Sequence, residues 1–233
     1  MAGGSDAARA PPPLPPWPPA PLRHRYFALR HGESEANVAG IIIADPAVGT
    51  QRYGLTPAGR AAVAAAAEAF AASALASTGE ASHPVALVAS DFTRTRETAE
   101  VFGETLAGLG KASTLELSEA MRERYFGELE GGPNSRYGEV WAEDSQDPRA
   151  EPFGAESAAS VWGRTTGLVS RLEAELPNDG RLVVIVSHGD ALQILQTAFQ
   201  GVSPAEHRSL QHLRPAELRE LQPSVAPPAQ AAG

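Results

Sequence analysis

The chain has 233 residues, 42% hydrophobic and 20% charged, a balance typical of one globular domain with a sizeable core. It contains no cysteine, which excludes disulfides, thiolate metal sites and cysteine nucleophiles. The net charge of −9 argues against non-specific binding to nucleic acids or acidic membranes, and no apolar run approaches the length of about 18 residues that indicates a membrane-spanning helix.

The N-terminal segment, residues 1–22, is predicted to be a disordered, proline-rich tail outside the fold. Its run PPPLPPWPP, residues 11–19, cannot form a helix or a central strand, because proline lacks a backbone N–H and has a fixed φ. Such a run favours polyproline II, which is either a ligand for an SH3- or WW-type domain or an unselected tail. Residues 223–233 are also expected to be disordered, which leaves 23–222 as the folded domain.

Strands and helices alternate between these two tails. The expected strands are residues 24–30, 85–89, 114–117 and 181–187, and the expected helices are residues 56–76, 92–107, 156–176 and 190–200. This alternation predicts an α/β fold, a three-layer sandwich in which helices cover both faces of a mainly parallel central sheet. The segments 38–53 and 127–155 follow no regular pattern, so we expect them to be irregular walls of a pocket.

Polar residues directly follow three of the predicted strands. Arg30 and His31 end the first, Arg94 comes shortly after the second, and His188 follows the last. Ligands bind at the carboxyl edge of such sheets, so we expect these side chains to lie together. An arginine keeps its charge and suits phosphoryl oxygens, and a neutral imidazole nitrogen can attack phosphorus. The pattern therefore indicates phosphate chemistry.

In order and spacing, these segments resemble the histidine phosphatase superfamily, which also contains the cofactor-dependent phosphoglycerate mutases. The resemblance extends from Tyr26 to Leu221. The motifs that carry it are Arg30-His31-Gly32-Glu33-Ser34, Leu55-Thr56-Pro57-Ala58-Gly59, the segment 90–99, the segment 123–131, Glu156-Ser157 and Ser187-His188-Gly189.

The resemblance and the residue chemistry together assign the catalytic groups. We expect His31 to be the nucleophile, Arg30 and Arg94 to clamp the phosphoryl group through bidentate hydrogen bonds, and His188 to stabilise the transferring phosphate. Glu123 best matches the family's acid motif; it would protonate the leaving alcohol and then activate water.

Further residues receive secondary assignments. Glu119 is the second choice for the acid, and Arg96 is expected on a solvated face of its helix. The resemblance implies that Asn37 contacts phosphate, and we expect Ser34 and Gly189 to add weaker contacts to the substrate. We expect no cofactor and no metal, because a zinc-protease spacing is absent and Arg30 and Arg94 would repel a cation.

The resemblance leaves hydrolysis and mutase chemistry open. The interval from Glu123 to His188 is 188 − 123 = 65 residues, which is like the phosphatase members, and it lacks the paired arginine of the mutases. After the second His-Gly the mutase pattern is Asn-Ser-Leu-Arg, whereas this chain has Asp-Ala-Leu-Gln at 190–193. We therefore expect a phosphatase acting on a small phosphorylated metabolite. A phosphoglycerate mutase, or a non-catalytic scaffold that uses the proline-rich tail, stays as an alternative.

The expected location is the cytoplasm, with organelle targeting by the N-terminal segment left open. Neither nucleic acid nor a membrane is expected as a partner.

Overall fold

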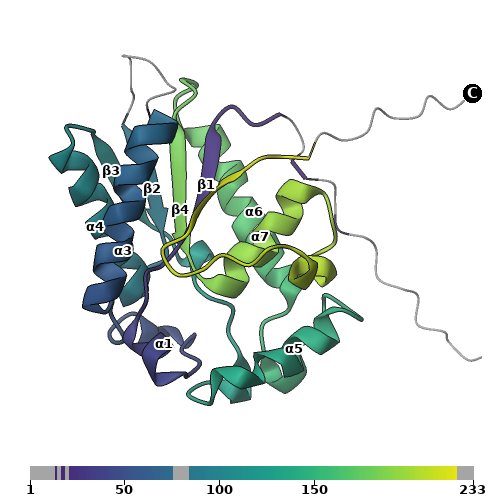
Figure 1. Ribbon diagram of the computed structural model, residues 1–233. Coiled ribbons are helices and arrows are strands. Elements are labelled where there is room, and N and C mark those ends of the chain that lie inside the picture. Colours follow the sequence, from purple (N-terminus) through teal and green to yellow (C-terminus); the bar gives the residue numbers. More distant parts are fainter. Residues whose placement is uncertain (1–13, 15–16, 19–20, 76–83, 225–233) are drawn as a thin grey trace, which may run out of the picture.

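A computed structural model describes residues 14, 17–18, 21–75 and 84–224 (Figure 1). Its centre is a five-stranded sheet in the order β3-β2-β4-β1-β5, in which only the edge strand β5 is antiparallel to its neighbour. The strands are β1 (Arg25–Arg30), β2 (Val85–Ala89), β3 (Ser113–Leu117), β4 (Leu182–Ser187) and β5 (Leu218–Leu221). The predicted α/β fold with a mainly parallel sheet is confirmed.

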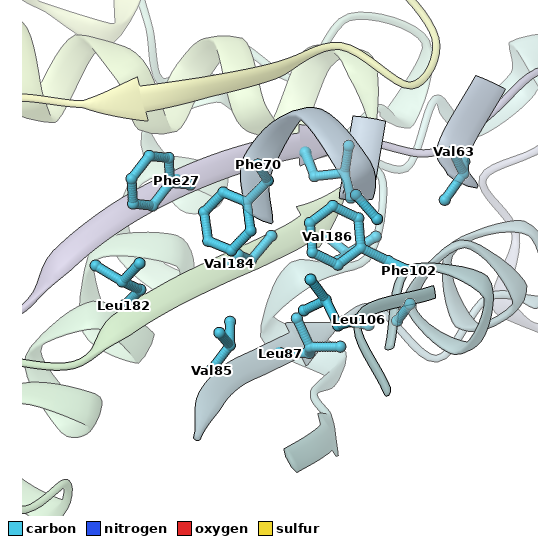
Figure 2. Packing of buried hydrophobic residues seen from close by; sticks show 14 of the residues in the cluster. Phe27, Val63, Phe70, Val85, Leu87, Phe102, Leu106, Leu182, Val184 and Val186 are labelled. Carbon is cyan, nitrogen blue, oxygen red and sulfur yellow. The ribbon is translucent and has the colours of Figure 1, made fainter. Parts of the chain in front are cut away.

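Two pairs of helices cover the two faces of the sheet. Alternate side chains of β1 point to opposite faces, so that Phe27 and Leu29 enter one hydrophobic cluster while Tyr26 and Ala28 enter the other. The first cluster, shown in Figure 2, packs against α3 (Pro57–Phe70) and α4 (Thr93–Gly108). The second packs against α6 (Ala158–Glu175) and α7 (Gly189–Gln200). These helices and the sheet are the three predicted layers.

Local signals in the sequence explain where these helices begin. Thr56 caps α3, since its hydroxyl accepts from the Gly59 N–H at 3.0 Å, and Pro57 occupies the first turn. Ser157 caps α6 in the same way. The α3 helix continues as a π-helical turn, η1 (Ala71–Leu75), close to the predicted end of that helix.

The segments that were expected to be irregular contain several short helices. They are α1 (Glu35–Ala39), α2 (Pro46–Gly49), η4 (Gly127–Leu129), η5 (Asn134–Arg136), α5 (Tyr137–Asp144) and η6 (Pro152–Gly154). We call residues 35–54 and 127–155 the cap, because they lie beyond the carboxyl end of the sheet (Figure 1). An isolated bridge between Ile41 and Pro133 joins its two parts, and a separate apolar cluster around Phe126 and Val140 fills it. The expectation of irregular structure was wrong. The apolar residues that hold the short helices together come from two distant segments, so neither segment shows a regular pattern by itself.

Three residues of the proline-rich segment pack against the fold. The Trp17 ring lies edge-on against Phe199, with centroids 4.9 Å apart, and its Nε1 donates to Ser170 at 3.3 Å. Leu14 and Leu22 also pack against buried clusters. The expectation that the whole segment lies off the fold is wrong at these positions, because burial of large apolar side chains opposes solvation of the chain.

The other parts of the two predicted tails, 1–13, 15–16, 19–20 and 225–233, lie outside the described residues. At the C-terminal end, the Ser224 N–H donates to the carbonyl of Phe199 at 2.7 Å, so contact with the domain continues past residue 222. Within the described ranges, no helix combines the length and the apolar character needed to cross a membrane.

Trp17→Ala is expected to lower the free energy of unfolding by about 1–2 kcal/mol, since a half-buried indole loses its contacts with Phe199 and α6. Trp17→Phe keeps the ring contact and should retain most of this stability. Urea unfolding of both variants measures the difference. An unchanged midpoint for Trp17→Ala would mean that the segment contributes nothing to stability in solution.

Candidate active site

The carboxyl ends of β1, β2 and β4 bring together the four basic residues that the sequence singled out. Arg30 is the last residue of β1 and pairs in register with Ser187 of β4, so His31 and His188 emerge side by side with ring centroids 5.3 Å apart. Arg94 lies in the first turn of α4, which follows β2. Parallel pairing of neighbouring strands is therefore what assembles the cluster.

His31 is held as a neutral imidazole whose Nε2 electron pair accepts a hydrogen bond from Arg94. Its Nδ1 donates to the carbonyl of Gly32 at 2.8 Å, which leaves Nε2 as an acceptor, 3.2 Å from Nε of Arg94. Only 3% of the residue is exposed. Burial, followed by the charges of Arg94 and Arg30, holds the pKa of His31 well below its ordinary value. The neutral form is the one that can act as a nucleophile.

Three buried donors around His31 have no hydrogen-bond partner among the described residues. They are Nε of Arg30, Nη1 of Arg94 and Nδ1 of His188. A buried donor without a partner costs about 1–3 kcal/mol, so such groups are usually satisfied by water, an ion or a ligand. The two arginines among them carry a positive charge near neutral pH. Burial lowers the pKa of Arg94 only to about 10. The cluster is therefore suited to a bound oxyanion.

His188 has a defined orientation. Its Nε2 lies 3.0 Å from the Ser90 hydroxyl, which in turn accepts from the Phe92 N–H at 3.3 Å. The hydroxyl can then donate to Nε2, which leaves Nδ1–H as the donor that faces the cluster. Burial, with the positive charge of Arg94, holds the pKa of His188 well below its ordinary value. His188 therefore offers a neutral hydrogen-bond donor.

The Glu123 carboxylate is held beside the beginning of α7. Its Oε1 accepts from the N–H groups of Arg124 at 3.0 Å and Ala191 at 3.1 Å. Burial raises its pKa, and the nearby charge of Asp190 adds to the shift. A carboxyl with a raised pKa is suited to donate a proton near neutral pH. The second choice, Glu119, is 75% exposed and pairs with Arg122, so it lies outside this cluster.

The three predicted substrate contacts have clear structural roles. Ser34 and Asn37 form the capping box of α1, in which each side chain bonds to the backbone of the other residue. Gly189 leaves room for two neighbours, since a Cβ built on it would lie 3.2 Å from Cε1 of His212 and 3.4 Å from Cζ of Arg30. Contacts of Ser34, Asn37 and Gly189 with a substrate remain predictions.

Sequence reasoning missed two residues at this site. His212, in the loop before β5, accepts a hydrogen bond from Arg30 Nη1 at 2.7 Å, and no motif marks it. Tyr137 of α5 is the second: burial, followed by the negative charge of Glu123, raises the pKa of its phenol. A cap residue could be placed here only once the cap itself was known.

A buried ion network lies behind Glu123. The Arg124 guanidinium is fully buried; its Nη1 and Nη2 donate to both oxygens of Asp144 at 2.5 and 2.8 Å, and Nη1 lies 3.3 Å from Asp190. Asp190 also accepts from Nε1 of Trp141 at 2.9 Å. Its pKa is lowered to about 2: burial opposes ionisation, but the His207 ring, whose Nε2 lies 3.5 Å from Oδ1, and the charge of Arg124 outweigh it. The network ties α5 of the cap to the first turn of α7.

Arg94→Ala is expected to raise the activation barrier by about 3 kcal/mol, roughly a hundredfold loss in kcat/KM, because it removes a preorganised donor beside His31. Arg96→Ala is the matched control on the same helix. Arg96 is half-exposed, and its ion pair with Glu100 is long at 3.8 Å. Its loss should therefore change kcat/KM little. Steady-state kinetics with p-nitrophenyl phosphate compares them. Similar losses in both variants would show that Arg94 has no special role.

The family of the chain follows from a comparison with family models. The model of the histidine phosphatase superfamily (branch 1) matches residues 26–226. No curated protein sequence matches the chain. Among solved structures, Mycobacterial hydrolase 1 is 24% identical, with a TM-score of 0.68 over 84% of this chain and 88% of the other.

Two further solved structures share the fold. A mycobacterial glucosyl-3-phosphoglycerate phosphatase in complex with VO3 is 24% identical, with a TM-score of 0.67 over 84% of this chain and 90% of the other. YhfR of Bacillus stearothermophilus is 23% identical, with a TM-score of 0.63 over the same shares of the two chains. The family model covers most of the sequence, and the basic cluster occupies the carboxyl edge of the matching fold. The chain therefore belongs to the histidine phosphatase superfamily.

Proposed function

We propose that this protein is a phosphatase that hydrolyses small phosphomonoesters through a phosphohistidine on His31. One observation carries the proposal: the acceptor Nε2 of His31 is surrounded by unpartnered buried donors on Arg30, Arg94 and His188. Phosphoryl oxygens would supply the missing acceptors while phosphorus lies opposite Nε2. Enzymes accelerate phosphoryl transfer mainly by positioning the reacting groups and by stabilising the charge on the phosphoryl oxygens.

The reaction would proceed in two transfers. In the first, the electron pair of His31 Nε2 forms a bond to phosphorus, the ester P–O bond breaks, and the leaving oxygen takes a proton from Glu123. In the second, the Glu123 carboxylate takes a proton from water while the water oxygen attacks phosphorus. The P–N bond breaks and its electron pair returns to Nε2. The net result is an alcohol and inorganic phosphate, with both side chains restored.

The polar surroundings of Glu123 favour a polar leaving alcohol. Besides facing α7, Glu123 lines a cleft of about 350 Å³ together with Arg122, Tyr125, Glu156 and Arg164. Hydroxyl groups of a sugar-like alcohol could exchange hydrogen bonds with these side chains. The similar mycobacterial structure is described as a phosphatase of glucosyl-3-phosphoglycerate, which agrees with this class of substrate.

Ion pairing in the interval between Glu123 and His188 favours hydrolysis over a mutase reaction. A mutase must bind a second anionic group, so it needs further unpaired cations. Here Arg124 pairs with Asp144, Arg136 with Glu139 at 2.8 Å, and Arg164 with Glu156 at 2.8 Å. These guanidinium groups are already neutralised by carboxylates.

The test uses the full chain with p-nitrophenyl phosphate, a panel of sugar phosphates and 3-phosphoglycerate. We expect release of inorganic phosphate from the first two and no isomerisation of 3-phosphoglycerate. Isomerisation faster than phosphate release would establish the mutase instead. Absence of both activities would favour the scaffold role suggested by the proline-rich segment.

Glu123→Gln is expected to slow phosphohistidine formation severely with a sugar phosphate, because its alkoxide leaving group needs a proton. With p-nitrophenyl phosphate the leaving group needs little protonation, so the first step should slow much less. Single-turnover measurements of the phosphoenzyme separate this step from the water step. Equal losses with both substrates would make Glu123 a binding or structural residue. Glu128→Gln is the matched control, since Glu128 is exposed and does not line the cleft of Glu123.

A further inference from the structure

A continuous chain of hydrogen bonds leads from the surface to Arg30. The exposed Arg208, whose guanidinium stacks 3.7 Å from the Trp141 ring centroid, donates to Oε1 of Gln193. The same Oε1 lies 2.9 Å from Nδ1 of His212, and Nε2 of His212 lies 2.7 Å from Nη1 of Arg30. Gln193 is on α7, whereas His212 is in the loop before β5.

The chemistry of each atom fixes the direction of every bond in this chain. The carboxamide oxygen of Gln193 can only accept, so Nδ1 of His212 must carry a proton. Arginine can only donate, so Nε2 of His212 must be without one. His212 is therefore the neutral tautomer protonated on Nδ1. Its other surroundings agree: burial, followed by the charges of Arg30 and Arg208, lowers its pKa to about 4.

Arg30 depends on a small number of acceptors for its orientation. Its Nη1 is shared between His212 and the carbonyl of Leu213 at 2.8 Å. The opposite side of the guanidinium carries Nε, which is buried and has no described partner. Because the guanidinium is planar and rigid, the hydrogen bonds of Nη1 also fix the direction of the Nε–H bond. Removal of His212 would leave one acceptor and allow the guanidinium plane to rotate about its bond to the Leu213 carbonyl.

We propose that His212 is a positioning residue for Arg30, and that Gln193 selects the tautomer of His212 that can accept from the guanidinium. This inference rests on the proposed function, in which Nε of Arg30 contacts the phosphoryl group. His212 itself contacts no reacting atom. Partners of this kind fix the orientation of the groups that touch the ligand. At metal sites their loss typically costs about 10- to 100-fold in affinity or activity, and we expect a similar loss here.

The first experiment measures binding of inorganic phosphate by titration calorimetry, which requires no turnover. His212→Phe is expected to weaken phosphate binding by about tenfold or more, because the variant keeps an aromatic ring but loses both nitrogens. His212→Asn, whose amide oxygen can accept from Arg30, should recover part of the loss. Unchanged phosphate affinity in His212→Phe would overturn the proposal, and so would equal losses in the two variants.

A matched pair of glutamines on α7 separates positioning from packing. Gln193 and Gln196 are both buried, and each accepts from an arginine through Oε1: Gln193 from Arg208 and Gln196 from Arg219 at 2.8 Å. Only Gln193 also contacts His212. Gln193→Leu should weaken phosphate binding, whereas Gln196→Leu should leave it unchanged even where both lower the melting temperature. Parallel effects on phosphate affinity would reduce Gln193 to a structural residue. This pair also tests the proposal if His212→Phe fails to fold.

Failure of the proposed function has a different signature. A wild-type chain that binds phosphate but does not hydrolyse any ester would overturn the phosphatase assignment. The phosphate affinities of the His212 variants would still test the positioning role of His212. A wild-type chain that does not bind phosphate at all would overturn both proposals. In active protein, we expect the His212 and Gln193 variants to raise KM for p-nitrophenyl phosphate and to lower kcat, because Arg30 contacts the phosphoryl group before and during transfer.

Discussion

His31→Ala should abolish the covalent phosphoenzyme and lower turnover by at least about a thousandfold. Removing a nucleophile in other hydrolases costs even more than this, since no remaining group can replace the covalent step. The measurement is rapid quenching with a phosphorylated substrate, followed by detection of an acid-labile phosphoprotein. His24→Ala is the matched control, because His24 is another buried histidine, at the amino end of the same strand.

The His24 variant should label normally even if its stability falls. Near wild-type turnover in His31→Ala would show that the nucleophile is elsewhere. Loss of label with persistent turnover would indicate direct attack by water on the ester. The two results are distinguishable because label and phosphate release are measured in the same quenched samples.

Asp144→Ala is expected to lower the free energy of unfolding by about 3 kcal/mol or more, since it leaves the guanidinium of Arg124 buried with only Asp190 as a charged partner. Both side chains of the broken pair are fully buried, so bulk solvent does not screen the charge that is left. Chemical denaturation monitored by tryptophan fluorescence measures the change. Activity should fall as well, because the backbone N–H of Arg124 holds Glu123.

Two further variants show whether burial of charge is the cause. Glu139→Ala breaks the exposed Arg136–Glu139 pair and should cost no more than about 1 kcal/mol. The triple variant Arg124→Met, Asp144→Leu and Asp190→Asn removes all three buried charges of this network, so it should be more stable than Asp144→Ala alone. A triple variant as unstable as the single one would mean that packing, and not the unpaired charge, sets the cost.

The central sheet and the meeting of four basic residues at its edge were predictable because their signals are local. The buried strands are apolar runs, and Arg30, His31, Arg94 and His188 stand close to the end of a strand or the start of a helix that the pattern identifies. Parallel pairing then places those ends at one edge. Glu123 has no such local signal and was assigned through the family resemblance. Strand β5 gave no such signal, since Leu221 is the only one of its four residues that is buried.

The remaining parts of the site depend on contacts between distant segments. His212 acquires its role only because the loop before β5 passes Arg30, 182 residues away in the sequence. Trp17 looks like part of a solvated proline-rich run until Phe199 is seen beside it. The cap is assembled from two segments whose apolar residues are too sparse to form a pattern within either one. A single sequence carries no record of these pairings.

The separate core of the cap has a consequence for how this enzyme can evolve. The cluster around Phe126 and Val140 shares no buried residue with the two clusters that flank the sheet, so its side chains can be exchanged without repacking the strands that carry His31 and His188. Substrate preference can thus drift while the chemistry is conserved. The constraint on that drift is the set of polar bonds from α5 to Arg124 and Asp190. The backbone N–H of Arg124 holds the Glu123 carboxylate, and Asp190 lies in the first turn of α7.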